Sequence, residues 1–117
     1  MHAYKNQCAV CNLKHSELLD AAHIIADALE AGQPTTSNGI ALCKIHHAAY
    51  DKNFLGISPD YVVHINESLM VEVDGPMLKY GLQAMNKRAL SLPPLHRDRP
   101  RKDNLDIRFQ QFQAKAL

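Results

Sequence analysis

Apolar residues occur in short runs that turn residues separate, which predicts a small domain of short strands and helices. The run at 16–25 is expected to enter a short strand at 20–25, although its leucines and alanines also suit a helix. Residues 39–43 predict a second strand, and the spacing over 46–51 suits a helix that follows it. Two cysteines at a turn's spacing within 4–13 predict a small knuckle ahead of these elements.

Turn residues separate the two strands and define a hairpin after the helix. A short helical turn is expected at 26–31 and a loop at 32–39, where Gly, Pro, Ser and Asn gather. Residues 54–58 and 60–66 alternate apolar and polar side chains around Ser58-Pro59-Asp60, which is typical of a β-hairpin. We expect this hairpin to extend the same small sheet.

The remainder of the chain predicts less regular structure. A short helix is expected over 75–85, and the prolines of 91–100 favour an extended or irregular segment because proline lacks the donor that regular structure needs. Residues 103–116 predict a final amphipathic helix. Its expected apolar face consists of Leu105, Ile107, Phe109 and Phe112.

Composition narrows the class of protein. A chain of 117 residues with 46% hydrophobic and 21% charged residues is expected to form one domain with a modest core. No apolar run approaches the roughly 18 residues of a membrane span, and the first residues lack a signal peptide's apolar core, so we expect a cytoplasmic protein. In a reducing cytosol, three cysteines indicate metal binding or catalysis rather than disulfides.

The net charge of +1 conceals an asymmetry along the chain. Residues 1–85 carry five Lys and Arg against nine Asp and Glu, a balance of −4, whereas 86–117 carry eight against three, a balance of +5. A basic tail suits contacts to the phosphates of a polyanion, and it equally suits a solvated linker. The basic residues in or beside its Pro-containing segment are Lys87, Arg88, Arg97, Arg99, Arg101 and Lys102.

The strongest chemical signal is a pair of cysteines followed some thirty residues later by a cysteine and a histidine at the same spacing. Two such pairs can close around a tetrahedral zinc ion. The predicted ligands are Cys8, Cys11, Cys43 and His46. Four protein ligands leave no open position, so this Zn²⁺ is predicted to be structural and to staple a small core. The alternative is that the cysteines are ordinary small buried residues.

A second group of polar residues lies close to the first along the chain. Residues four apart share a helix face, so His47 and Asp51 can present a nitrogen and a carboxylate oxygen to one divalent cation. His46 and His47 are adjacent and point about 100° apart on a helix, so each can serve a different metal. His23 and Asn38 complete this group, although His23 taken alone also fits a hydrogen-bonded histidine of an apolar strand.

The order of these residues resembles the HNH endonucleases, a family with the ββα-metal fold. The likeness rests on CxxC, then Asp-Ala-Ala-His-Ile, then Ser-Asn-Gly-Ile-Ala-Leu-Cys-x2-His-His-x3-Asp. His23, Asn38 and His47 match the His, Asn and His of the family motif. The similarity is greatest to HNH domains at the C-terminal end of bacterial restriction-type endonucleases, and it extends more loosely into the tail.

The resemblance implies metal-dependent hydrolysis of nucleic acid phosphodiesters, most readily in duplex DNA. By this analogy His23 is the general base, because imidazoles titrate near neutral pH, and Asn38 holds the loop or the imidazole in orientation. His47 with Asp51 would hold one Mg²⁺, or another divalent cation such as Mn²⁺ or Ni²⁺. Many family members carry a metal-binding residue directly before the base, where this chain has Ala22; Asp20 is therefore a candidate ligand only, or a structural carboxylate.

Together these expectations define an α+β fold: a small ββα-metal core with a structural zinc knuckle, an extra β-hairpin and a C-terminal helix. We expect a single HNH nuclease domain over 1–117, with a core at about 4–66 and an extension at about 67–117. Its role would be in restriction or defence, and it could act as a homodimer or fused to an upstream DNA-recognition domain. Four basic residues of the tail would add contacts to DNA: Arg97, Arg99, Arg101 and Lys102. The alternatives are a zinc-stabilised DNA-binding module without catalysis and an RNA-directed nuclease.

Overall fold

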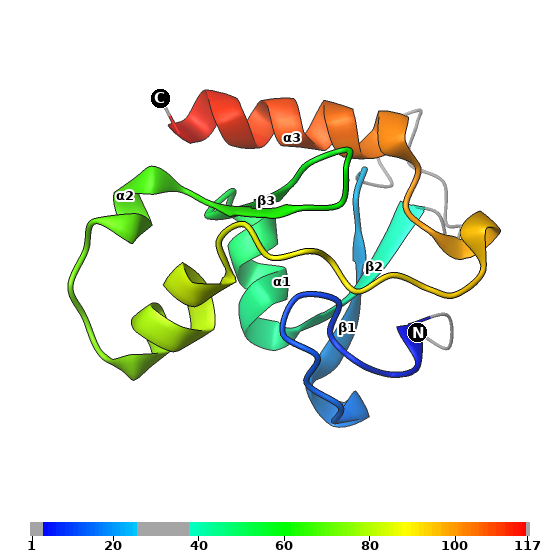
Figure 1. Cartoon of the computed structure of the whole chain (residues 1–117), viewed down its shortest axis with the longest axis horizontal. Helices are drawn as coiled ribbons and strands as arrows, with labels where there is room; N and C mark the ends of the chain where they lie inside the picture. Colours follow the sequence, from blue (N-terminus) through cyan, green and yellow to red (C-terminus); the bar gives the residue numbers. More distant parts are fainter. Residues whose placement is uncertain (1–3, 26–37, 117) are drawn as a thin grey trace.

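The computed structural model describes residues 4–25 and 38–116, and its elements are arranged as shown in Figure 1. The helical turn predicted at 26–31 and residues 32–37 of the predicted loop lie outside the described residues. No helix among the described residues is long and apolar enough to cross a membrane.

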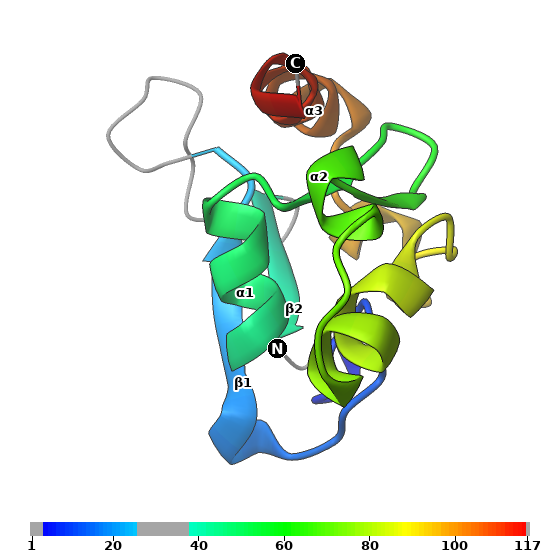
Figure 2. The same cartoon turned by 90° about the vertical axis from the view of Figure 1, so that its left-hand side faces the viewer.

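The first two strands form an antiparallel hairpin that leads directly into a helix. After a 3-10 turn, η2 (Ser16–Leu18), strand β1 (Leu19–His23) pairs with β2 (Gly39–Cys43) so that the first residue of β1 lies opposite the last residue of β2. Helix α1 (Lys44–Asp51) begins at the next residue and lies alongside the hairpin (Figure 2). The predicted strand at 20–25 is thus confirmed over its first part, and the helical alternative is wrong.

The second hairpin forms a sheet of its own. Strand β3 (Leu55–Ile57) pairs antiparallel with β4 (Val63–Ile65), as predicted, but neither strand joins the first sheet. The prediction of one extended sheet is wrong, and other segments bond to the outer edges of β2 and β4. Ala9 of the knuckle donates its N–H to Ala41 in β2, at 2.8 Å, and Val63 of β4 exchanges backbone bonds with residues 87–88.

The segment after β4 is irregular. A short helix, α2 (Glu67–Met70), is followed by a π-helical segment, η4 (Met77–Leu82), and a 3-10 turn, η5 (Gln83–Met85). The helix predicted over 75–85 is therefore confirmed, in an irregular form. The Pro-rich segment is extended as predicted, apart from one 3-10 turn, η6 (His96–Asp98).

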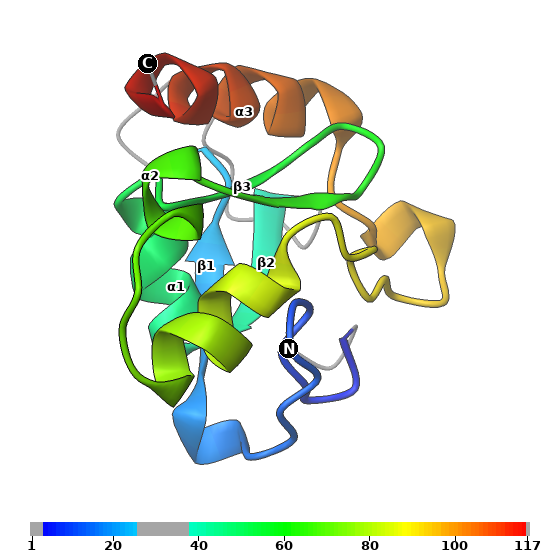
Figure 3. The same cartoon turned by 60° about the vertical axis from the view of Figure 1, so that its left-hand side comes forward.

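The final helix, α3 (Lys102–Ala116), packs across β3 (Figures 1 and 3). The close contact between α3 and β3 depends on Gly56 of β3, because a Cβ atom at this position would lie 2.5 Å from the ring of Phe112 in α3. Phe112 is buried, as predicted, but Ile107 is 43% exposed. The inner face follows the spacing from Leu105 through Arg108 to Phe112, so a charged residue occupies the place expected for an apolar one.

Candidate metal centres and nuclease site

The N-terminal knuckle is a tight turn that brings its two cysteines together. Asn12 adopts the left-handed conformation, with φ 66°, which asparagine tolerates better than most residues. The chain can then fold back, so that Asn12 N–H donates to the Cys8 carbonyl at 2.9 Å and Cys8 N–H donates to the Leu13 carbonyl at 3.0 Å. Local backbone bonding therefore presets the positions of Cys8 and Cys11.

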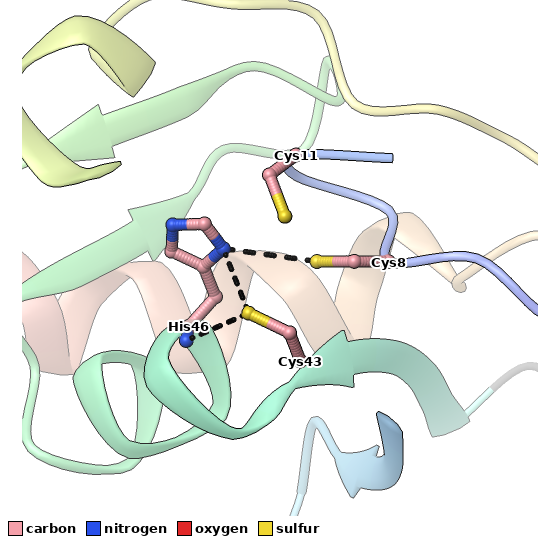
Figure 4. Close-up of side chains that lie close together, drawn as sticks. All are labelled: Cys8, Cys11, Cys43 and His46. Carbon is pink, nitrogen blue, oxygen red and sulfur yellow. Dashed lines mark hydrogen bonds between the residues drawn. The ribbon is translucent and has the colours of Figure 1, made fainter. Parts of the chain in front are cut away.

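The other pair of predicted ligands comes from the junction between β2 and α1. Cys43 ends β2 and caps α1, and its Sγ accepts a bond from the His46 backbone N–H at 3.4 Å. His46 lies in the first turn, with its ring directed at the knuckle (Figure 4). One ligand atom from each of the four predicted residues lies within 4.8 Å of every other, so the predicted Cys3His cluster is present.

The donor set and its spacing fit a structural metal ion, and three thiolates with one imidazole are a donor set typical of zinc. A tetrahedral zinc ion with bonds of about 2.0–2.3 Å separates its ligand atoms by about 3.3–3.8 Å. His46 Nδ1 lies 3.7 Å from Cys8 Sγ and 3.3 Å from Cys43 Sγ. Its other ring nitrogen, Nε2, lies 2.6 Å from the Gly81 carbonyl, an outer contact of the kind that orients metal-binding histidines.

Electrostatics within the cluster favour a thiolate at Cys8. Its pKa is lowered to about 3, first by the hydrogen bond from Cys43 and then by the bond from His46, against the opposing effect of burial. The pKa of Cys43 is raised, because its proton is shared with the Cys8 thiolate and its side chain is buried. A cation would favour ionisation of all three thiols, which is the state that zinc requires.

His47 faces away from the cysteines and lies between two carboxylates. Its Nδ1 is 2.8 Å from Asp20 Oδ2, and its Nε2 is 3.3 Å from Asp51 Oδ2. Asp20 also pairs with Lys44, and hydrogen bonds to His47 and then Lys44 lower the pKa of the Asp20 carboxyl. The structure thus brings together the predicted pair, His47 and Asp51, and adds Asp20 on the opposite side of the imidazole.

His23 and Asn38 lie at opposite ends of the segment that connects the first two strands. His23 ends β1 with an exposed side chain, whereas Asn38 is buried immediately before β2. The Asn38 side chain accepts from the Ile25 N–H at 3.0 Å and donates to the Ile25 carbonyl at 3.1 Å. The Asn38 side chain is therefore bonded to the backbone two residues after His23.

The predicted tail residues gather around one surface cavity of about 380 Å³. Its lining includes Arg97, Arg99, Arg101 and Lys102, together with Tyr61 and His96. Some of this charge is engaged, because Arg101 forms two bonds to Asp103 and Arg99 Nε donates to the Pro93 carbonyl at 3.0 Å. The cavity is thus basic, with part of its charge already compensated.

Two contacts at these sites have no counterpart in the sequence prediction. The Gly81 carbonyl beside His46 belongs to a backbone, so no side chain marks it. Arg108 of α3 donates to backbone carbonyls at the ends of β1 and α1. In the sequence, Arg108 could have been recognised only as a charged residue on the inner face of the amphipathic helix predicted over 103–116.

Comparisons with known proteins agree with this geometry. Residues 8–58 match the family model described as HNH endonuclease. The fold is similar to that of a solved "Modification dependent TagI restriction endonuclease", with a TM-score of 0.62 and 20% sequence identity over 94% of this chain and 34% of that chain. The present chain thus spans about a third of that protein's length. No curated protein sequence matches it.

Residues 8–58 thus carry the sequence pattern of the HNH endonuclease family. Its β1, β2 and α1 form the ββα unit expected of the ββα-metal fold, with the Cys3His cluster at one side and the C-terminal helix packed on the second hairpin. Family and fold together support a nuclease that acts on nucleic acid.

Proposed function

We propose that this chain is a metal-dependent endonuclease domain that hydrolyses phosphodiester bonds of double-stranded DNA. The observation that carries the proposal is the placement of His47 between Asp20 and Asp51 on a partly exposed helix face, in a chain whose adjacent strand ends at the exposed His23. A purely structural zinc module has no need for these groups at these positions.

His47 and Asp51 are the proposed ligands of one divalent cation. The separation of 3.3 Å between His47 Nε2 and Asp51 Oδ2 suits two ligands of a single ion. The other nitrogen of His47 is held by Asp20, which favours an orienting role for Asp20 over direct coordination. When bound, Mg²⁺ or a similar ion would stabilise the charge that develops on the phosphate and on the leaving oxygen.

His23 is the proposed general base. Its imidazole would take a proton from the attacking water as the water oxygen bonds to phosphorus and the bond between phosphorus and the 3′ oxygen breaks. The 3′ oxygen would then take a proton from solvent, which leaves 5′-phosphate and 3′-hydroxyl ends. Asn38 would act through the backbone, because its two bonds to Ile25 hold the chain just beyond His23. The structural zinc would be held by the Cys3His cluster at a distance from this chemistry.

Substrate and context are inferred from the structural neighbour. Because that protein is a modification-dependent restriction endonuclease, we propose DNA as the substrate and restriction or defence as the role. We also propose a cytoplasmic location, where such a nuclease would meet incoming DNA. Each centre of this kind would cut one strand, so cutting both strands would need a homodimer or two successive engagements. This chain spans about a third of the neighbour's length. We therefore propose that a fused upstream domain would recognise the bases.

The basic cavity is the proposed site of additional DNA contact. Arg97, Arg99, Arg101 and Lys102 line it together, and guanidinium groups suit phosphate oxygens. Contacts of this kind position a duplex without reading its sequence.

The test is cleavage of supercoiled plasmid by the purified protein with Mg²⁺, Mn²⁺ or Ni²⁺, with EDTA as the control. His23→Ala is expected to lower the rate by about 100-fold or more while the fold and zinc content stay unchanged. His15→Ala, another exposed histidine, is the matched control and should cut like the wild type. Equal activity of His23→Ala would remove the base assignment.

Two alternatives have distinct outcomes in the same assay. A folded, zinc-containing protein that binds DNA but cuts with none of the metals would be a non-catalytic binding module. Preferential cutting of single-stranded or structured RNA would instead indicate an RNA-directed nuclease.

A further inference from the structure

Arg108 of α3 extends its side chain to the ends of two elements of the nuclease unit. The side chain is 13% exposed. Its NH1 donates to the Ile24 carbonyl at 2.9 Å and to the His23 carbonyl at 3.3 Å, and its NH2 donates to the Tyr50 carbonyl at 2.8 Å. One guanidinium therefore bridges the last residue of β1 and the last turn of α1.

These contacts are of a strong kind. Arginine presents its donors in a rigid planar fork, and bonds from a charged donor strengthen where water is largely excluded. The guanidinium carbon also lies 4.1 Å from the centre of the Tyr50 ring, within range of a cation–π interaction. A positive charge at the C-terminal end of α1 is further favoured by the helix dipole.

The bridged elements carry the proposed chemistry. The end of β1 bears His23, and the end of α1 bears Asp51, whose Oδ1 lies 3.9 Å from Arg108 NH2. β1 and α1 are joined through β2, but a strand and a helix share no backbone ladder, so side-chain contacts are needed to fix the ends of β1 and α1 against each other. Asp20 and His47 supply one contact toward the start of both elements, and Arg108 supplies another at their ends.

We propose that Arg108 is a positioning residue of the nuclease centre, which fixes His23 relative to the metal ligands on α1. The inference rests on the proposed function for the identity of that centre. It makes α3, which lies beyond the segment 8–58 that matches the family model, a working part of the nuclease unit. Arg108 itself would touch neither the metal nor the DNA.

A purely structural tether of α3 is the competing explanation, and the chain provides a matched control for it. Lys115 also connects α3 to the region after α1, because its Nζ donates to the Lys52 carbonyl at 2.8 Å and lies 5.1 Å from the Phe54 ring. These partners follow α1, whereas those of Arg108 belong to the ends of β1 and α1 themselves. Replacement of Lys115 should therefore weaken the docking of α3 without misplacing the nuclease centre.

The experiment compares Arg108→Met and Arg108→Lys with Lys115→Met, all in the zinc-loaded full chain. We expect both Arg108 variants to lower kcat for plasmid nicking by about 10-fold or more with KM little changed, because misplacement of reacting groups acts mainly on the chemical step. Lys115→Met should keep the wild-type kcat. Thermal unfolding and zinc content are measured for every variant.

A second readout separates this proposal from the proposed function. Mn²⁺ affinity, measured by electron paramagnetic resonance without DNA, should fall several-fold in Arg108→Lys and remain unchanged in Lys115→Met. If the wild type cuts no nucleic acid, the nuclease proposal fails, while the Mn²⁺ comparison still tests the positioning role. If Arg108→Met does not fold, Arg108→Lys carries the test. A folded Arg108→Lys with the kcat and Mn²⁺ affinity of Lys115→Met would overturn the inference.

Discussion

Helix α1 contributes neighbouring histidines to two different polar clusters, His46 to the Cys3His cluster and His47 to the group with Asp20 and Asp51, and the two clusters differ in burial and composition. The Cys3His cluster is closed, with three of its four residues buried, Cys11 partly buried, and His46 in contact with the Gly81 carbonyl. The group around His47 is open, with side-chain exposures of 27% for His47 and 53% for Asp51. A closed set of four ligands suits a structural ion, and a small open set suits an ion that must meet substrate.

Adjacent positions in the sequence produce this contrast. His46 and His47 differ by one residue, which turns their side chains about 100° apart around the helix. The hairpin then determines their surroundings, because β2 delivers Cys43 to one side of α1 and β1 delivers Asp20 to the other. Burial and neighbours, rather than residue type, separate the two proposed roles.

Replacement of each neighbouring histidine should have the largest and most distinct effects. His46→Gln removes a ligand of the buried cluster, so we expect loss of zinc and a fall in unfolding temperature of about 10 °C or more, because structural zinc binding contributes directly to folding. His47→Gln should keep zinc and the unfolding temperature but lose metal-dependent cleavage.

Zinc analysis, calorimetry and plasmid nicking on both proteins measure this difference. Cys11→Ser serves as an independent disruption of the cluster and should behave like His46→Gln. A zinc-replete, normally stable His46→Gln protein would remove the structural assignment of this histidine.

The two proposed metals should be removed in two stages, first the cation of the exposed His47 group and then the zinc of the Cys3His cluster. Brief treatment with EDTA is expected to abolish cleavage reversibly, because the exposed site exchanges its cation with solvent, while zinc stays in the buried cluster. Prolonged treatment with a strong zinc chelator should then unfold the domain. Circular dichroism and zinc release are followed together with activity; unfolding at the first stage would contradict the assignment of two separate metals.

Replacement of the carboxylates on either side of His47 should have smaller effects than replacement of the histidines, and the two replacements should lower Mg²⁺ affinity to different extents. Asp51→Asn removes a proposed ligand charge and should lower Mg²⁺ affinity by about 10-fold or more. Asp20→Asn keeps an oxygen that can accept from His47 Nδ1, so a smaller reduction is expected. Activity measured against Mg²⁺ concentration compares the two variants, and a larger effect at Asp20 would make Asp20 the ligand instead.

The elements and groups that sequence reasoning located are those fixed by short-range rules. The spacing of Cys8 and Cys11 defines a turn, and the polar and apolar pattern defines the strands and α1. Asp20 could be named only as a candidate, because its partner His47 lies 27 residues away.

What the sequence missed depends on long-range interactions with backbone atoms. A carbonyl such as that of Gly81 is present at every residue and gives no signal until the chain folds. Arg108 was hidden for the same reason, since its partners are the carbonyls of distant residues. The bonds at the outer strand edges are also long-range. The knuckle bonds to β2 and residues 87–88 bond to β4, and the alternation of apolar and polar residues within a strand reveals neither contact.

The basic cavity should produce the smallest effect, because it lies outside both metal groups. Replacing Arg97, Arg99, Arg101 and Lys102 with Ala is expected to weaken DNA binding and to reduce the slope of log affinity against log salt by up to about 0.9 for each phosphate that is no longer neutralised. Arg101 should contribute least, since Asp103 already engages its guanidinium through two bonds. Filter binding at several salt concentrations measures the slope for the fourfold variant and for Arg101→Ala alone. An unchanged slope in the fourfold variant would make the cavity a solvated surface and leave DNA binding to the nuclease centre alone.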